Sequence, residues 1–308
     1  MSEQTNGESK PVVTSQLLPK LPDIPVPVTD FRGPTPWSNF VIQGRVLVGA
    51  YPATINDSET RDILLKLLKL GINTFVCLQA EFNLGVSEFS WRSGKTLRPY
   101  IKDAQKLLME AKRARQSDSN EFNDLLDIKQ SKLDLLHLPI VDGSVTSDSA
   151  ISNLADDCCQ RILNGERLYI HCWGGHGRSG TLVAIILSRL YGLSGLDSLH
   201  YTQQMHDVRI SSQNTGSPQT QAQIIQVLRI ISQTDPLEYQ KTFKWPFNAL
   251  LPFTANEEER WKYKMRMASL KEEESTATDA CSKIEGDKRP RAINIIADAM
   301  NSIAAETR

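Results

Sequence analysis

One cysteine and one arginine stand six positions apart in this chain, and the residues between them are suited to binding an oxyanion. Cys172 and Arg178 enclose Gly174, Gly175 and Gly177. Glycines accept backbone angles that strain other residues, so successive N–H groups can turn inward around one small anion. The guanidinium of Arg178 adds a planar set of donors that matches two oxygens of a phosphate. These residue types indicate a phosphate-binding loop with a thiol at its rim.

The neighbouring segments are those that such a loop needs. An apolar run at residues 168–171 predicts a buried strand, and a helical segment begins near Ser179. The positive N-terminal end of this helix would lie at the same hollow. A thiol beside positive groups loses its proton more readily and becomes a nucleophile, so we expect Cys172 to attack phosphorus. A glycine-rich turn between a strand and a helix is also compatible with ordinary α/β packing.

The order His171-Cys172, five residues, Arg178-Ser179 resembles the loop of the cysteine-dependent protein tyrosine phosphatases, in particular the dual-specificity type. The resemblance covers roughly residues 37–232. It implies that Arg178 holds the equatorial phosphate oxygens, that Ser179 donates a hydrogen bond to the departing sulfur, and that His171 braces the loop from beneath, unless His171 is simply a core histidine. The phosphate-binding loop would consist of Trp173, Gly174, Gly175, His176, Gly177 and Arg178.

The general acid is expected directly after the strand predicted at residues 133–140. In the phosphatases that this chain resembles, a mobile loop at this place carries an aspartic acid that protonates the leaving oxygen. Asp142 fits because it follows the strand, precedes a flexible glycine and belongs to a Pro-Ile-x-Asp stretch similar to that of dual-specificity enzymes. Asp148 is the competitor, but it stands at the start of a helix predicted at residues 150–163, where the helix dipole stabilises a carboxylate.

A glutamine pair extends the resemblance. Gln219 and Gln223 match the motif with which classical tyrosine phosphatases position the hydrolytic water, although two glutamines in a first helical turn are also common polar surface. The helix that carries them is predicted to begin with Ser217 as its cap and Pro218 at its first position.

A second thiol lies on the strand predicted at residues 72–78. Some related phosphatases keep a resolving cysteine on this neighbouring strand, but the aligned position is Gln79 here. We therefore expect Cys77 to be a plain buried residue rather than the disulfide partner of Cys172.

The rest of the chain alternates between strand and helix patterns. Strands are predicted at residues 41–42, 46–50, 72–78, 133–140 and 168–171, and helices at residues 57–70, 100–112, 150–163, 181–191 and 196–205. Such alternation is typical of an α/β fold with a central, mostly parallel sheet flanked by helices.

Composition divides the chain into four parts. Residues 1–36 are polar and rich in proline, which predicts an extended, disordered arm. Residues 37–232 form the phosphatase domain, with an insertion at about 82–132 that either shapes the approach to the site or is solvated surface. An aromatic-rich accessory segment follows at residues 233–270. Residues 271–308 are a polar linker and a short amphipathic helix, which docks on a partner or packs within the chain.

Charge and cysteine content narrow the class of protein. A chain of 308 residues with 40% hydrophobic residues and a net charge of −1 can form a real core but lacks the basic balance of a nucleic-acid binder. No apolar run approaches the roughly 18–20 residues of a membrane span, so stable membrane insertion is not expected. The five cysteines form neither a metal pattern nor a secreted framework. We expect an intracellular protein of the cytoplasm or nucleus that needs no metal or organic cofactor.

The resemblance implies a phosphatase that acts on phosphorylated protein through a phosphoryl-cysteine intermediate. The substrates would be phosphotyrosine, with phosphoserine and phosphothreonine as further candidates. One alternative is a phosphoinositide or inositol-phosphate phosphatase, but lipid-directed relatives place lysines inside the loop, whereas this loop has Trp173 and only His176 as a part-time cation. The other is an inactive phosphate-binding module, which would be expected to have lost the cysteine, the arginine or the acid.

Overall fold

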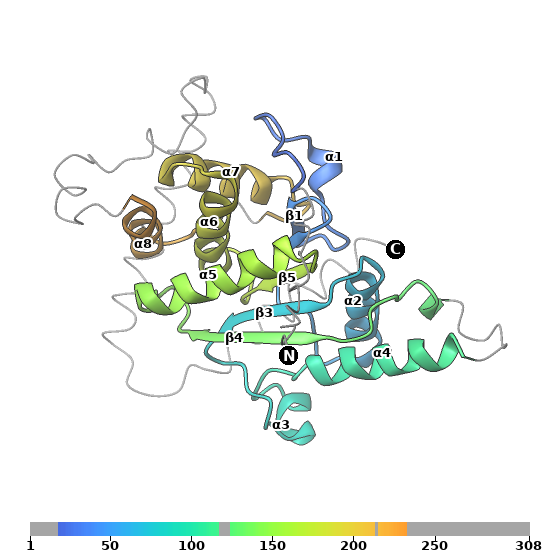
Figure 1. Ribbon diagram of the computed structural model, residues 1–308. Helices are drawn as coiled ribbons and strands as arrows, with labels where there is room; N and C mark the ends of the chain where they lie inside the picture. Colours follow the sequence, from blue (N-terminus) through green and yellow to red (C-terminus); the bar gives the residue numbers. More distant parts are fainter. Residues whose placement is uncertain (1–17, 117–123, 213–214, 233–308) are drawn as a thin grey trace, which may run out of the picture.

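A five-stranded sheet forms the centre of the computed structural model, which describes residues 18–116, 124–212 and 215–232 (Figure 1). The strand order is β1-β2-β5-β3-β4, where the strands are β1 (Ser38–Ile42), β2 (Val46–Gly49), β3 (Thr74–Gln79), β4 (Asp134–Ile140) and β5 (Leu168–His171). Only the edge strand β1 is antiparallel to its neighbour, and the other three pairings are parallel. The prediction of a central, mostly parallel sheet is confirmed.

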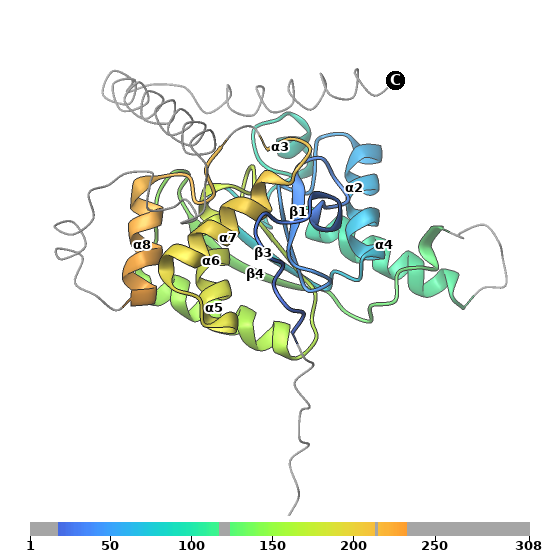
Figure 2. The same cartoon turned by 90° about the horizontal axis from the view of Figure 1, so that it is seen from above.

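Helices cover both faces of this sheet. They are α1 (Val28–Phe31), α2 (Asp57–Lys69), α3 (Glu88–Arg92), α4 (Ile101–Ala114), α5 (Asp148–Leu163), α6 (Gly177–Tyr191), α7 (Gly195–Asp207) and α8 (Gln221–Ser232). Helices α5, α6, α7 and α8 lie on one side, and α2 and α4 lie on the other (Figures 1 and 2).

Alternation along the strands divides the buried apolar residues between two cores, because successive strand side chains face opposite sides of a sheet. On β2, Val46 and Val48 belong to the core beneath α5 to α8, whereas Leu47 belongs to the core beneath α2 and α4. On β3, Val76 and Leu78 face the first core. Both faces of β3 are therefore buried, as expected for a parallel strand within an α/β sheet.

The parallel arrangement fixes the place of the functional residues. Strands β3, β4 and β5 run in the same direction, so their carboxyl ends meet at one edge of the sheet. In open α/β sheets, ligands bind in the crevice outside these ends. The segments that follow β3, β4 and β5 are therefore brought together there.

Helix α4, which lies within the predicted insertion, packs one face into the core. Tyr100, Ala104 and Ala111 have no exposed area, and α4 packs against α2 and the sheet. The sequence left both interpretations open because α4 also carries many charges. These charges lie on its outer face, so the helix is amphipathic in the usual way.

Residues 18–36 pack against the domain, which differs from the disordered arm predicted for residues 1–36. The hydroxyl groups of Tyr191 and Tyr201 donate hydrogen bonds to the carbonyl oxygens of Pro19 (2.8 Å) and Pro22 (3.0 Å). Apolar side chains between the prolines, such as Val26, are buried. The prediction weighed the proline and polar content and neglected these spaced apolar residues.

Helix α8 begins later than predicted. The Oγ1 atom of Thr220 accepts from Gln223 N (3.4 Å), and the Oε1 atom of Gln223 accepts from Thr220 N (3.1 Å), which is the reciprocal pattern of a capping box. The Ser217 hydroxyl instead donates to the carbonyl oxygen of His176 (3.1 Å). Ser217 as the cap, with Pro218 at the first helical position, is therefore wrong.

The accessory segment predicted at residues 233–270 and the helix predicted within 271–308 lie outside the described residues. Among the residues that are described, no helix combines the length and the apolar character needed to cross a membrane.

Candidate active site

The loop between β5 and α6 contains the predicted thiol, and the first turn of α6 contains the predicted arginine. Strand β5 ends at His171, Cys172 follows, and α6 begins at Gly177. Gly175 has φ +72°, and a Cβ atom there would lie 2.3 Å from the carbonyl oxygen of Gly49. Both the left-handed backbone and the close approach to β2 require glycine at this position. The loop is thus pressed against the end of β2.

Arg178 is almost completely buried, and acidic groups surround its guanidinium. Its Nη2 atom lies 2.7 Å from Oδ1 of Asp142, and its Nη1 atom lies 3.2 Å from Oε2 of Glu81. Nη1 also donates to the carbonyl oxygen of Ile140 (2.9 Å). Burial lowers the pKa of Arg178, but the nearby charges of Cys172, Asp142 and Glu81 outweigh it, so the net pKa is raised. The arginine is held in place as a permanent cation.

Two buried donors of the loop have no hydrogen-bond partner among the described residues. These are Nε of Arg178 and the hydroxyl group of Ser179. A buried polar atom without a partner loses its hydration without compensation, at a cost of about 1–3 kcal/mol. Both atoms belong to residues that closely follow the buried Cys172 in the chain, and such unpartnered donors are suited to bind the oxygens of a phosphate or a sulfur atom.

The two candidate acids have different surroundings. Asp142 directly follows β4, its side chain is 70% exposed, and it reaches Arg178. Asp148 instead begins α5 and receives two hydrogen bonds of 2.6 Å from Arg229, which lower its pKa. Asp142 is thus beside Arg178, whereas Asp148 connects α5 to α8.

Helix α8 holds the loop that carries Asp142. Thr220 Oγ1 donates to the carbonyl oxygen of Gly143 (3.2 Å), Gln223 Nε2 to that of Ser144 (3.2 Å), and Gln226 Nε2 to that of Thr146 (2.6 Å). Thr220, which caps α8, and Gln223 and Gln226 within α8 are spaced three residues apart. They therefore lie on the same side of the helix. The pattern explains how an exposed segment keeps Asp142 next to Arg178.

The glutamine pair lies against the phosphate loop. A Cβ atom at Gly177 would be 2.6 Å from Oε1 of Gln223 and 3.1 Å from Cβ of Gln219. The amide of Gln223 accepts two hydrogen bonds in the cap of α8 and donates one to Ser144. The side-chain amide of Gln219 has no hydrogen bond within the described part of the chain and is half-buried. The two glutamines therefore differ in what they can offer to a ligand.

His171 supports the loop from below. Burial lowers its pKa to about 3, so the ring is neutral at ordinary pH. Its Nε2 atom lies 2.7 Å from the hydroxyl group of Tyr100, and its Nδ1 atom lies 3.3 Å from the carbonyl oxygen of Cys172. The simplest tautomer has Nδ1 protonated and Nε2 accepting from Tyr100.

The other side chains of the loop turn toward the protein. Nδ1 of His176 lies 2.7 Å from Nε2 of His206 on α7, and the His176 ring is buried. The carbonyl oxygen of Trp173 accepts from the backbone N–H of Tyr51 (2.8 Å), and the two aromatic rings are 6.2 Å apart. Arg178 is therefore the cation that the loop offers to a bound anion.

Arg209 is a functional residue that the sequence did not reveal. Its guanidinium is buried and donates to the carbonyl oxygens of Gly174 and Gly175, both at 3.0 Å, and to Oδ1 of Asn39 at 2.7 Å. Since the C=O and N–H of a trans peptide point in opposite directions, the N–H groups of Gly175 and His176 face away from Arg209. The available signal was an arginine between two apolar residues, which is weak.

Glu81 was also not proposed as a site residue. It follows the carboxyl end of β3, as Asp142 follows β4 and Cys172 follows β5. The sequence did contain a signal for Glu81. It is an acidic residue just after a strand that pairs in parallel with β5, and the carboxyl ends of parallel strands lie close together. Glu81 forms an ion pair with Arg178, so Glu81 and Asp142 together orient the guanidinium group.

Comparisons with known proteins agree with this geometry. Residues 116–234 match the family model "PTP-SAK: Swiss Army Knife protein, DSP-PTPase phosphatase domain". The chain is 41% identical over 51 residues to putative tyrosine phosphatase 067L of Invertebrate iridescent virus 3, which is 17% of this chain and 21% of that protein. It is 29% identical over 76 residues to uncharacterized protein MJECL20 of Methanocaldococcus jannaschii, which is 24% of this chain and 49% of that protein. The chain thus aligns with a fifth to a half of the length of these curated relatives.

Two solved structures are similar to this chain at low sequence identity. Tk-PTP in its active form is 21% identical, with a TM-score of 0.43, over 65% of this chain and 99% of that chain. The kinase associated phosphatase with its catalytic cysteine replaced by serine is 16% identical, with a TM-score of 0.40, over 61% of this chain and 86% of that chain.

Residues 116–234 of the chain are thus similar to a phosphatase domain of the dual-specificity type. The segment matched by the family model contains β4, β5 and the phosphate loop, whereas β1, β2 and β3 of the same sheet precede it.

Proposed function

We propose that this protein hydrolyses phosphate monoesters on other proteins, phosphotyrosine first and also phosphoserine and phosphothreonine, through a phosphoryl-cysteine intermediate. One observation carries the proposal. Cys172 and Arg178 lie in one glycine-rich loop at the N-terminal end of α6, and the carboxylate of Asp142 lies 2.7 Å from Arg178. A nucleophile, an anion holder and an acid are thus present in one place.

In the first step, the Cys172 thiolate attacks the phosphorus atom and the bond from phosphorus to the ester oxygen breaks. Arg178 and the loop N–H groups stabilise the charge on the remaining oxygens, which a preorganised set of donors does well. The substrate phosphate takes over Arg178 from Asp142, the released carboxylate takes up a proton from solvent, and the resulting carboxylic acid protonates the leaving oxygen. General acid catalysis of this kind contributes about 10²–10⁴ in rate.

In the second step, water attacks the phosphoryl-cysteine. The Asp142 carboxylate accepts a proton from the water, the sulfur–phosphorus bond breaks, and inorganic phosphate and the Cys172 thiolate are released. The unpartnered hydroxyl of Ser179 donates to the departing sulfur. We assign the orientation of the water to Gln219 rather than to Gln223, because the Gln223 amide is already bonded.

The charges around the loop support a substrate with one phosphate group. Arg178 is accompanied by two acids, Glu81 and Asp142, which disfavour additional phosphates close by. The imidazole of His176, which is the other cation candidate within the loop, is bonded to His206. These contacts favour a protein phosphomonoester over a multiply phosphorylated inositol ring at the active site.

A substrate panel tests the proposal. Phosphopeptides that contain phosphotyrosine, phosphoserine or phosphothreonine are compared with inositol phosphates and phosphoinositides by release of inorganic phosphate. We expect the highest kcat/KM for phosphotyrosine peptides. Cys172→Ser should remove turnover but keep peptide binding, whereas Cys159→Ser, at another buried cysteine, should keep both. Preferred hydrolysis of inositol phosphates would overturn the protein substrate, and near-normal turnover by Cys172→Ser would overturn the nucleophile.

A further inference from the structure

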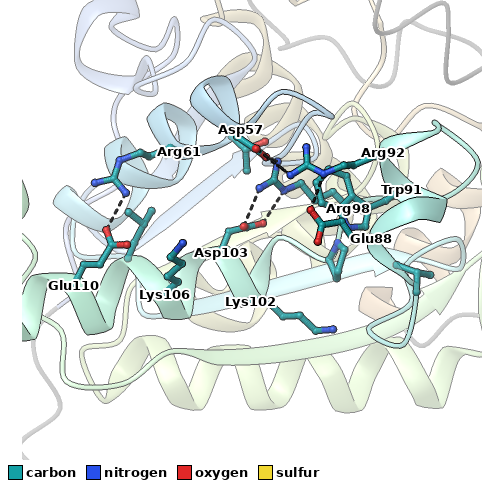
Figure 3. A pocket seen from close by; sticks show the side chains of 14 residues that line it. Asp57, Arg61, Glu88, Trp91, Arg92, Arg98, Lys102, Asp103, Lys106 and Glu110 are labelled. Atoms are coloured by element: carbon teal, nitrogen blue, oxygen red, sulfur yellow. Dashed lines mark hydrogen bonds and ion pairs between the residues drawn. The ribbon is translucent and has the colours of Figure 1, made fainter.

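A cavity lies beside the inserted segment and away from the phosphate loop. Its volume is about 490 Å³, and residues of α2, α3 and α4 form most of its wall (Figure 3). Cavities of this size typically hold a small organic ligand. Its lining includes no residue between His171 and Ser179. Tyr51 lies between the two sites. Its hydroxyl donates to the carbonyl oxygen of Arg98 in the cavity wall, and its backbone N–H donates to the carbonyl oxygen of Trp173 in the loop.

The four acids of this cavity are all engaged by arginines. Asp57 lies 2.6 Å from Arg98 and 3.0 Å from Arg92, and Asp103 lies 2.8 Å from Arg98. The other two pairs are Glu88 with Arg92 (2.7 Å) and Glu110 with Arg61 (2.9 Å). The dashed lines in Figure 3 show a connected group around Asp57 and, apart from it, the pair of Arg61 and Glu110. Each carboxylate thus has an arginine partner, but four carboxylates share three arginines, so these side chains together keep one net negative charge.

Two lysines make the net charge of the lining positive. Lys102 and Lys106 line the cavity from successive turns of α4, and neither forms an ion pair or hydrogen bond through its side chain with the described residues. Residues four apart on a helix are neighbours, so the two ammonium groups share one face. Like charges at this spacing destabilise a helix slightly, which a bound anion would reverse.

The arginine part of the wall is rigid. Arg92 and Arg98 lie over the ring of Trp91, each 4.4 Å from its centre, and the indole is only 7% exposed. Both arginines keep N–H groups beyond those that bind the acids, since a guanidinium has five donors. Because the indole ring is covered, the cavity offers no exposed aromatic face for stacking a sugar or a base. It recognises its ligand by charge and hydrogen bonds.

We propose that this cavity binds a small organic molecule that carries more than one phosphate group. Lys102 and Lys106 bind its phosphates, and the free N–H groups of the arginines complete the contacts. The volume exceeds the needs of a single inorganic anion, and the two lysines provide two adjacent points of attachment. The site is separate from catalysis and does not depend on the function proposed for Cys172.

Binding is measured by isothermal titration calorimetry on the full chain that carries Arg178→Met, so that the catalytic loop does not hold the probe. The probes are myo-inositol hexakisphosphate and inorganic phosphate, in about 150 mM salt, where exposed charges are screened beyond roughly 8 Å. Lys102→Gln with Lys106→Gln removes the proposed contacts. The matched control is Lys69→Gln with Lys112→Gln, which removes the same charge from exposed positions on α2 and α4 outside the cavity. Circular dichroism and thermal unfolding verify that all variants are folded.

We expect one inositol hexakisphosphate per chain, an affinity at least tenfold lower in the Lys102/Lys106 variant, and no more than a twofold change in the control. Inorganic phosphate should bind far more weakly. Absence of inositol hexakisphosphate binding, or an equal loss in both lysine variants, would overturn the site. Equal affinity for inorganic phosphate would overturn its preference for an organic polyphosphate.

Discussion

The hydroxyl group of Tyr100 lies 2.7 Å from Nε2 of His171, so the inserted segment directly supports the residue that precedes Cys172. Both side chains are fully buried. Tyr100 also contacts the rings of Tyr51 and Phe82, at centroid distances of 5.3 and 5.6 Å. The inserted segment thus helps to hold the phosphate loop in place, although it contains none of the predicted catalytic residues.

Tyr100→Phe should lower both stability and turnover. It leaves Nε2 of His171 buried without a partner, which costs about 1–3 kcal/mol, and it loosens the residue next to Cys172. We expect a severalfold fall in kcat with little change in KM. The matched control is Tyr191→Phe. It removes a hydroxyl that donates to the carbonyl oxygen of Pro19, at the end of α6 opposite the loop. Equal kcat values in the two variants would show that the contact serves stability alone.

The buried neutral His171 also predicts a loss of stability in acid. Its pKa is about 3 in the folded protein, whereas that of an unfolded histidine is about 6.5. Between these values the unfolded chain binds the additional proton, so the free energy of unfolding falls as pH decreases from about 6.5 toward 3. The largest slope from one proton is about 1.4 kcal/mol per pH unit. Urea unfolding at pH 7.0, 5.5 and 4.5 should show this fall, and His171→Asn should reduce the slope.

Much of the fold and the core of the site could be predicted because the relevant information is local. The thiol and the arginine lie within seven consecutive residues, and the glycines between them directly indicate a tight turn with unusual backbone angles. Strand and helix positions followed from apolar periodicity, with ends that differ by a few residues. Asp142 was placed by its position after a strand, and the structure puts it against Arg178.

The remaining features depend on contacts between distant segments, which one sequence does not encode visibly. Arg209 reaches Gly174 across 35 positions, and the three residues of α8 that hold the Asp142 loop are about 80 positions from it. Ser217 looked like a helix cap because its local sequence fits one, but its hydroxyl is taken by the loop carbonyl of His176. Tertiary contacts prevailed over local propensity at each of these places.

Arg209→Lys should impair catalysis while leaving the domain folded. Lysine keeps the positive charge but cannot donate to Asn39, Gly174 and Gly175 at once with the same fixed geometry. The loop would then hold its N–H groups less firmly, and we expect kcat/KM to fall about tenfold or more. The rate of alkylation of Cys172 by iodoacetamide should change as well.

The control for Arg209 is Arg189→Lys. Arg189 bonds to Ser152 and Asp156 on α5 and has no contact with the loop. It should show normal turnover and normal alkylation. A normal kcat/KM in Arg209→Lys would remove Arg209 from the positioning of the loop.

Replacement of the two candidate acids should separate their roles. Asp142→Asn should slow the cleavage of alkyl phosphates more than that of aryl phosphates with good leaving groups, because the latter need less protonation. Asp148→Asn should keep the ratio of these two rates and lower stability instead, since it loses the carboxylate that holds Arg229. The measurement is kcat/KM for a series of esters with different leaving groups. A steep leaving-group dependence in Asp148→Asn alone would reverse the assignment.

Oxidation should inactivate the enzyme through Cys172 and leave Cys77 uninvolved. A nucleophilic thiolate reacts with peroxide to give a sulfenic acid, which thiol reductants reverse. Cys77 pairs in register with His171 on β5 and faces the core beneath α2 and α4, whereas Cys172 belongs to the core on the opposite side of the sheet. Side chains that face opposite sides of a sheet do not have the Cβ separation that a disulfide needs.

The reactivity of Cys77 leads to the same expectation. Burial raises the pKa of its thiol to about 12, so it remains protonated and a poor nucleophile toward a sulfenic acid. Mild peroxide should therefore abolish turnover, dithiothreitol should restore it, and Cys77→Ser should recover at the same rate and to the same extent as the unmodified protein. Mass spectrometry of the peroxide-treated protein provides the direct measurement. A disulfide between Cys77 and Cys172, or slower recovery in Cys77→Ser, would mean that the sheet opens enough to bring the two thiols together.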